Sequence, residues 1–347
     1  MITPAGPPDD DRYSRQTRFS GIRRAGQERL RASRVLVVGC GGLGTGTVNL
    51  LARSGVGSIT VVDRDLVELS NLQRQLLFDE ADALAGTPKA VAAAEAVGRI
   101  NCEVTVTPVV ADVTPDNVEA LVSGADVVLD GTDNLETRYL LNDACVKLGV
   151  PWIYGGAVGS TGMSMTVIPG ETACFRCLFP TRATSGTVAN CETVGVLAST
   201  VVMVSAFQWT EAIKLLVGDR DHLNRTMVYF DVWSNDHQEG ERLTPSPDCP
   251  CCGQRRFEFL EATATSSTTL LCGRNAVQVR PGHAMTLDLA DLARRLDGVG
   301  TVSATRFMLR LEVGGHELTV FSDGRAIIKG TDDVAVARSL YSRYVGD

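Results

Sequence analysis

The chain has 347 residues, of which 44% are hydrophobic and 21% charged, so it is long enough for about two globular domains with full apolar cores. Its formal net charge of −8 excludes the basic surface of a general nucleic-acid-binding protein, and we expect no nucleic-acid partner. Residues 1–11 are rich in proline and aspartate, unlike a signal peptide, so we expect a disordered tail on a cytoplasmic protein.

Predicted strands and helices alternate through the first 150 residues. Short apolar runs predict strands at 35–38, 58–63, 103–110, 125–130 and 151–154. Helical spacing of apolar residues predicts helices at 44–54, 88–100, 115–123 and 134–148. This alternation is typical of an α/β fold with a Rossmann-like, doubly wound, mostly parallel sheet.

Two more predicted strands, 162–168 and 227–232, flank an apolar helix at 194–216, so we expect the sheet to continue as a mixed one. The uncharged segment 193–210 has nearly the length of a membrane span. Serine, threonine and glutamine dilute it, however, which favours a buried core helix and no membrane association.

The composition changes near residue 261, where EATATSSTTL predicts a linker. We therefore expect a first domain over 12–260 and a small α+β domain over 261–347. The second domain contains the predicted strands NAVQV, TRFMLRLEV and HELTVF, and helices around 286–296 and from about 332.

A glycine-rich loop follows the first predicted strand. Gly39, Gly41 and Gly44 form the pattern GxGxxG, and Asp63 ends the second strand. This is the order of a nucleotide-binding βαβ unit, in which glycines let the backbone approach phosphates at a helix N-terminus. By itself the pattern indicates a nucleotide and does not separate NAD from ATP.

The cysteines form two CxxC pairs, Cys174 with Cys177 and Cys249 with Cys252. Four thiolates presented by two such turns match the tetrahedral coordination of a closed, structural zinc site. Small buried residues in turns are the alternative interpretation. Cys251 lies inside the second pair and competes as a ligand, but the spacing favours Cys249 and Cys252.

Lys89 lies in the first turn of a predicted helix, with Thr87 as its N-cap and Pro88 at its first position. The helix dipole disfavours a cation there unless a polyphosphate binds beside it. A phosphate contact and a solvated surface lysine are therefore the two interpretations of Lys89.

Polar residues also follow two of the predicted strands. The segment SNLQRQ presents Asn71, Arg74 and Gln75, which suit phosphates or ribose, with a surface salt bridge as the alternative. Asp133 and Asn134 lie just beyond the strand 125–130, where doubly wound sheets bind their ligands. Asp133 is a candidate magnesium ligand, a helix N-cap, or both.

These residues favour an ATP-using adenylating enzyme over an NAD-dependent dehydrogenase. A dehydrogenase needs an acid–base residue such as histidine, yet the four histidines lie outside every candidate segment: residues 222, 237, 283 and 316. Adenylation uses a carboxylate that is already ionised, and it needs cations and Mg²⁺ at the phosphates.

The chain resembles the ThiF/MoeB family, the bacterial relatives of ubiquitin-activating enzymes. The resemblance covers about residues 12–260 and rests on seven motifs in order: RYSRQ, GCGGLG, DRD, SNLQRQ, GTPK, DGTDN and the paired CxxC turns. It implies an enzyme that uses Mg-ATP to adenylate the C-terminal Gly-Gly carboxylate of a small ubiquitin-like sulfur carrier, of the kind that serves thiamine or molybdopterin biosynthesis. A separate sulfur donor, a cysteine desulfurase or a rhodanese, would then form the thiocarboxylate.

The resemblance also implies a role for each candidate residue. Asp63 would hold the ribose, Asp65 would help to order the site, and Asp133 would bind the metal ion. Arg15 would enter the ATP site of a neighbouring subunit, which implies a homodimer with shared sites. The nucleotide would lie against Gly39, Gly41, Gly42 and Gly44, and its phosphates against Asn71, Arg74 and Lys89, supported by Gln75.

The sequence leaves three alternatives: the role of Cys191, the role of the C-terminal segment, and enzyme or scaffold. Cys191 matches a cysteine that forms a covalent link with the carrier in some members and is dispensable in others. The segment 261–347 has only Cys272 and lacks a rhodanese-like cysteine loop, so it is either a partner-recruiting module or a structural cap. A catalytically degenerate scaffold of the same family is the main alternative to an enzyme, and an NAD-dependent dehydrogenase is a remote one.

Overall fold

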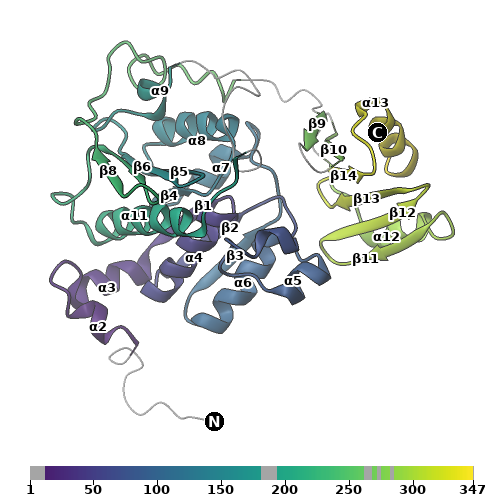
Figure 1. The fold of residues 1–347 in the computed structure, drawn as a ribbon, viewed down its shortest axis with the longest axis horizontal. Coiled ribbons are helices and arrows are strands. Elements are labelled where there is room, and N and C mark those ends of the chain that lie inside the picture. Colours follow the sequence, from purple (N-terminus) through teal and green to yellow (C-terminus); the bar gives the residue numbers. More distant parts are fainter. Residues whose placement is uncertain (1–11, 181–193, 262–267, 272–274, 282–284, 347) are drawn as a thin grey trace, which may run out of the picture. The chain divides into compact units, whose positions relative to one another are not determined.

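The computed structural model describes residues 12–180, 194–261, 268–271, 275–281 and 285–346. The chain divides into two compact units, Met1–Ala262 and Thr263–Asp347 (Figure 1). Cys191 and the N-terminal eleven residues lie outside the described part of the chain, so the predictions made for them stay predictions.

Within the described residues, the first unit is built on a sheet with the strand order β3-β2-β1-β4-β5-β6-β7-β8. The strands are β1 (Arg34–Val38), β2 (Ser58–Val62), β3 (Thr105–Val109), β4 (Val127–Asp130), β5 (Trp152–Val158), β6 (Thr161–Val167), β7 (Met227–Asp231) and β8 (Asp236–Glu239). β1 to β5 pair in parallel and β5 to β8 pair antiparallel, which confirms the predicted Rossmann-like sheet with a mixed extension.

Helices cover both faces of this sheet (Figure 1). They are α2 (Ser14–Thr17), α3 (Arg23–Ala32), α4 (Gly42–Ser54), η1 (Leu69–Asn71), α5 (Glu80–Ala85), α6 (Lys89–Ile100), α7 (Val118–Val122), α8 (Leu135–Leu148), α9 (Phe175–Leu178) and α11 (Ala198–Val217). Val35 and Val37 of β1 face a core shared with α3, α4, α6 and α11, whereas Leu36 and Val38 face a core shared with α7 and α8. Burial on both faces explains why the parallel strands are continuously apolar.

The apolar helix predicted near 194–216 is α11. Among the described helices, it is the one long and apolar enough to cross a membrane, and half of that stretch is buried inside the protein. It packs against α4, β5 and β6, and Gln208 in its middle donates to the carbonyls of Asp130 and Ile153. α11 is therefore a core helix of a soluble fold, as predicted.

The second unit contains an antiparallel sheet with two helices. Its described elements are β9 (Thr268–Leu271), β10 (Ala276–Val279), α12 (Leu289–Arg295), β11 (Thr301–Ala304), β12 (Met308–Val313), β13 (His316–Phe321), β14 (Ala326–Lys329) and α13 (Val334–Tyr344), with the strand order β11-β12-β13-β14-β10-β9. β9 takes the end of the segment predicted as a linker. Its threonines give no apolar strand pattern, and the strand is defined by its pairing with β10.

Candidate functional site

The glycine loop, residues 39–44, joins β1 to α4 at the carboxyl end of the parallel strands. Gly39 has a φ of +85°, and a Cβ there would lie 2.6 Å from the carbonyl oxygen of Gly131. A Cβ on Gly44 would lie 1.9 Å from the carbonyl oxygen of Gly39. Only glycine fits at these two positions. Gly41 caps α4 without a side-chain hydrogen bond, so the first turn of α4 presents backbone N–H groups suited to an anion.

Asp63 follows β2 and ties the glycine loop to the next loop. Its Oδ2 accepts a hydrogen bond from the Cys40 N–H (2.5 Å), and its Oδ1 accepts one from the Asp65 N–H (2.7 Å). The residue is only 9% exposed, and burial raises the pKa of its carboxyl group. A carboxylate has about four lone-pair positions, so Asp63 retains acceptor capacity for ribose hydroxyls.

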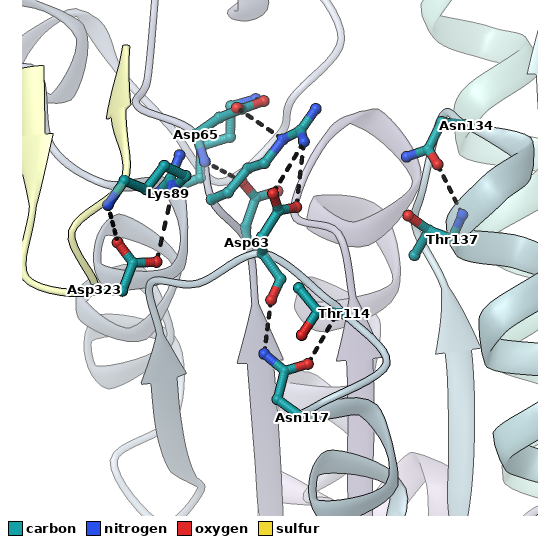
Figure 2. Close-up of polar contacts among 11 residues, drawn as sticks. Asp63, Asp65, Lys89, Thr114, Asn117, Asn134, Thr137 and Asp323 are labelled. Atoms are coloured by element: carbon teal, nitrogen blue, oxygen red, sulfur yellow. Dashed lines mark hydrogen bonds and ion pairs between the residues drawn. The ribbon is translucent and has the colours of Figure 1, made fainter. Parts of the chain in front are cut away.

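Lys89 is the first residue of α6 and is buried, with 4% of its surface exposed. Its Nζ lies 3.1 Å from Oδ2 of Asp65, and Figure 2 shows both residues close to Asp63. Burial alone would lower the pKa of Lys89, but the charges of Asp65, Asp63 and, more weakly, Asp133 outweigh it and raise the pKa. A solvated surface lysine is therefore the wrong interpretation: Lys89 is a charged group held among carboxylates.

The predicted cap of this helix is wrong by one residue. Pro88, and not Thr87, is the N-cap of α6, and it makes no side-chain cap. The Thr87 carbonyl accepts a hydrogen bond from Val67, and the Lys89 N–H donates to the carbonyl of Asp65. This extended pairing with the loop after β2 keeps Pro88 out of the helix and brings Lys89 against Asp65.

Asp133 is exposed in the loop between β4 and α8, so its carboxylate is accessible to a metal ion. The N-cap role considered for Asp133 belongs to Asn134, whose Oδ1 accepts from the Thr137 N–H at 2.9 Å (Figure 2). Asn134 is thus occupied in starting α8, and its assignment to the nucleotide remains a prediction.

A buried ion pair that the sequence did not predict lies beneath this loop. Nε of Arg138 lies 3.1 Å from Oδ2 of Asp130, and its Nη2 donates to the carbonyls of Thr132 and Gly155. Asp130 also accepts from the Thr132 N–H and hydroxyl, so the pair fixes the backbone that leads to Asp133. The available signal was an arginine four residues after the N-cap of α8.

Of the three residues singled out in SNLQRQ, Asn71 and Gln75 are buried and Arg74 is half-buried. Asn71 is buried, and its Oδ1 accepts from the Glu68 N–H at 3.1 Å, so this side chain builds the local turn. Gln75 is also buried, with Nε2 beside Gly41, and Arg74 lies beside Gly42 while donating to the Ser70 carbonyl. Arg74 and Gln75 therefore border the glycine loop, and the phosphate contact predicted for Asn71 stays a prediction.

Arg15 is exposed on α2, a short helix that is firmly anchored. The buried Tyr13 hydroxyl accepts from Asn101 Nδ2 at 2.8 Å, and Gln16 Nε2 donates to the carbonyl of Ser54 and to Gln27 Oε1. Buried anchors on both sides hold the backbone while the guanidinium of Arg15 faces outward. This placement suits contact with another protein chain.

The two CxxC turns meet in one cluster, as predicted. The Sγ atoms of Cys174, Cys177, Cys249 and Cys252 all lie within 4.8 Å of one another. Three of the separations are 3.9 Å (Cys174–Cys177), 3.6 Å (Cys174–Cys249) and 3.3 Å (Cys177–Cys252). Tetrahedral zinc with Zn–S bonds of about 2.3 Å requires sulfur atoms about 3.8 Å apart. The cluster therefore fits a zinc ion held by four thiolates.

Comparison with known proteins identifies the family of this chain. The model of the ThiF family matches residues 13–251. The chain is 41% identical over 337 residues to the sulfur carrier protein ThiS adenylyltransferase of Bacillus subtilis, covering 96% of this chain and 99% of that protein. It is 43% identical over 251 residues to the SAMP-activating enzyme E1 of Haloferax volcanii, covering 72% of this chain and 92% of that protein.

A solved structure shows the same fold at lower identity. The crystal structure of E. coli MccB with MccA-N7isoASN aligns with a TM-score of 0.62 and 23% identity, over 72% of this chain and 76% of that one. At this identity the likeness concerns the fold alone. With the family model and both relatives in agreement, the chain belongs to the ThiF family.

Proposed function

We propose that this protein is an ATP-using adenylyltransferase that activates the C-terminal carboxylate of a small sulfur carrier protein. The observation that carries the proposal is the 41% identity to the ThiS adenylyltransferase over 96% of the chain. That match leaves out far fewer residues than the second unit contains, so it includes most of that unit. The carrier we favour is therefore a ThiS-like protein with a C-terminal Gly-Gly.

The residues around Lys89 suit carboxylate adenylation. A carboxylate oxygen of the carrier attacks the α-phosphorus of ATP, a new O–P bond forms, and the bond to the β-phosphate breaks to release pyrophosphate. The carboxylate is ionised at neutral pH and needs no general base, so the protein supplies position and positive charge. Lys89 and Arg74 would neutralise the phosphates, and Asp63 would hold the ribose at the glycine loop.

The proposed function includes two metal ions, one at the nucleotide and one at the cysteine cluster. Asp133 would bind the Mg²⁺ that accompanies ATP and draws charge from the phosphate oxygens. The four-cysteine cluster would hold a structural Zn²⁺. The second unit contains only Cys272 and no rhodanese-like cysteine loop, so we assign sulfur delivery to a separate donor protein, a desulfurase or rhodanese acting in the cytoplasm.

The test of the function is ATP–pyrophosphate exchange with purified Gly-Gly carriers of the ThiS, SAMP and MoaD kinds. We expect exchange with a ThiS-like carrier and none with the same carrier after deletion of its last glycine. A degenerate scaffold would bind nucleotide or carrier without exchange. Tight NAD binding without exchange would instead support a dehydrogenase and contradict the proposal.

A homodimer would explain the exposed position of Arg15. Apolar side chains stand at the surface of the first unit, among them Val202 (41% exposed) and Phe207 (36%) on α11 and Trp233 (79%) after β7. A second copy of the chain is the partner that we infer for this surface, and Arg15 would then enter the ATP site of that copy.

Mixing two inactive variants tests the shared site. Arg15→Ala and Lys89→Met should each slow exchange by at least about 100-fold, whereas co-refolded mixtures should recover about one quarter of the wild-type rate, since half of the dimers are mixed and each has one intact site. Exchange in the mixture that equals the sum of the separate variants would show that Arg15 acts within its own chain or not at all.

A further inference from the structure

The four-cysteine cluster is joined to the rest of the first unit through one buried side chain of α8. Asn142 is completely buried, with 0% of its surface exposed. Its Oδ1 accepts a hydrogen bond from the Phe175 N–H at 2.8 Å, and its Nδ2 donates to Sγ of Cys251 at 3.2 Å. Phe175 lies within the first CxxC turn and Cys251 within the second. The amide thus bridges two turns that are 75 residues apart in the sequence.

The orientation of this amide follows from its partners. A backbone N–H can only donate, so the oxygen of Asn142 must face Phe175, and the NH₂ group must face Cys251. The sulfur of Cys251 serves as the acceptor there, and it is not among the four Sγ atoms that lie within 4.8 Å of one another. The position of Cys251 therefore differs from that of its neighbours: it anchors the second turn to α8.

The next residue of α8 supports the same region. Asp143 Oδ2 accepts from the Phe259 N–H at 3.0 Å, just beyond the second turn. Tyr139, one turn earlier, stacks on the ring of Phe259 with centroids 4.7 Å apart and meets the Phe175 ring edge-on at 5.2 Å. Helix α8 therefore contacts both cysteine-bearing segments, and Asn142 is the one of these three side chains whose polar atoms reach into both CxxC turns.

We propose that Asn142 is a positioning residue for the metal bound by the four cysteines, and that Cys251 is its anchor in the second turn and not a ligand. By fixing both turns to α8, Asn142 holds the four sulfur atoms at tetrahedral spacing before the metal arrives. Partners outside the coordination sphere typically contribute about 10–100-fold to metal affinity. This inference rests on the proposal that the cluster binds zinc, which the metal content of the wild-type protein tests separately from adenylation.

The experiment uses the full-length zinc-loaded protein and measures zinc affinity by competition with a coloured chelator. Asn142→Ala should bind zinc about 10–100-fold more weakly than wild type. The matched control is Gln208→Ala, which removes another fully buried amide, from α11, that donates to two carbonyls away from the cysteines. Gln208→Ala should lower the thermal midpoint and leave zinc affinity unchanged. Unaltered affinity in Asn142→Ala, or an equal loss in Gln208→Ala, overturns the proposal.

Variants of Cys251 complete the test. Cys251→Ala removes the acceptor and should weaken zinc binding, and the loss in the double variant should be smaller than the sum of the two single losses, because both changes break the Asn142–Cys251 hydrogen bond. Cys251→Ser keeps an acceptor and should retain near wild-type affinity and an unchanged thiolate-to-cobalt absorption band after Co²⁺ substitution. A weaker band in Cys251→Ser would identify Cys251 as a ligand. Fully additive losses of zinc affinity in the double variant would show that Cys251 and Asn142 act independently. Either result contradicts the proposal.

Discussion

Lys89→Met is expected to slow ATP–pyrophosphate exchange by about 10²–10³-fold, the usual effect of removing one preorganised group that stabilises developing charge. The ammonium is buried 3.1 Å from the Asp65 carboxylate and is kept charged by Asp65 and Asp63, so no rearrangement is needed to receive a phosphate. The loss should appear in the maximal rate as well as in the apparent affinity for ATP. Lys89→Arg keeps the charge and should lose less.

The matched control for this prediction is Lys147→Met. Lys147 also pairs with a carboxylate, at 2.9 Å from Glu119, but it lies in the last turn of α8 at the opposite end of the helix from Asn134. The Lys147→Met variant should catalyse exchange at the wild-type rate. All three tryptophans, Trp152, Trp209 and Trp233, belong to the first unit, so their fluorescence reports whether each variant is folded. A folded Lys89→Met that exchanges as fast as Lys147→Met would remove Lys89 from the phosphate site.

Loss of the metal from the four-cysteine site is expected to lower the thermal midpoint of the first unit by about 10 °C or more. Structural zinc contributes about 10–16 kcal/mol in small zinc domains, as much as the whole stability of many proteins. In this protein the cluster also packs on the apolar core through Phe175, whose ring lies 5.7 Å from that of Trp152. Tryptophan fluorescence during heating, with and without a chelator, measures the effect.

The same site predicts a direction for the pH dependence. Burial, together with the neighbouring Cys177 thiol, raises the pKa of Cys252 to about 12, so Cys252 of the metal-free cluster is a neutral thiol at pH 7. Zinc binds thiolates and must displace such a proton, so zinc affinity should fall as the pH is lowered. Cys177→Ser should abolish tight binding, whereas Cys102→Ser, which alters an exposed cysteine outside the cluster, should not. Equal behaviour of these two variants would exclude the four-cysteine site as the metal site.

Several features could be predicted from the sequence because they depend on short segments. The glycine loop was recognisable because Gly39 and Gly44 meet backbone atoms that leave no room for a Cβ. The CxxC turns were recognisable because each pair supplies two sulfurs from one local turn. Strands buried on both faces form unbroken apolar runs, which made the parallel part of the sheet clear.

Other features escaped the sequence analysis because their partners are far apart in the chain. The start of α6 depends on pairing between residues 65–67 and 87–89, so local capping rules placed it one residue early. The polar edge strands β8 and β9 are defined by their neighbours and have little apolar pattern of their own. The capping role of Asn134 is a local exception, because its partner, the Thr137 N–H, lies three residues away and the sequence allowed Asp133 or Asn134 as the cap.

The sequence by itself determined the fold class, the glycine loop and the two CxxC turns, because local spacing and residue type specify each of them. Only the tertiary structure decided that Lys89 is buried against Asp65, that Arg138 pairs with Asp130 beneath the Asp133 loop, and that Asn142 joins the two cysteine turns. A charged or amide side chain looks the same in a sequence whether it is solvated or buried. Its role is fixed by the partner that the fold brings to it, since an unpaired polar group cannot remain in the interior without a large cost in free energy.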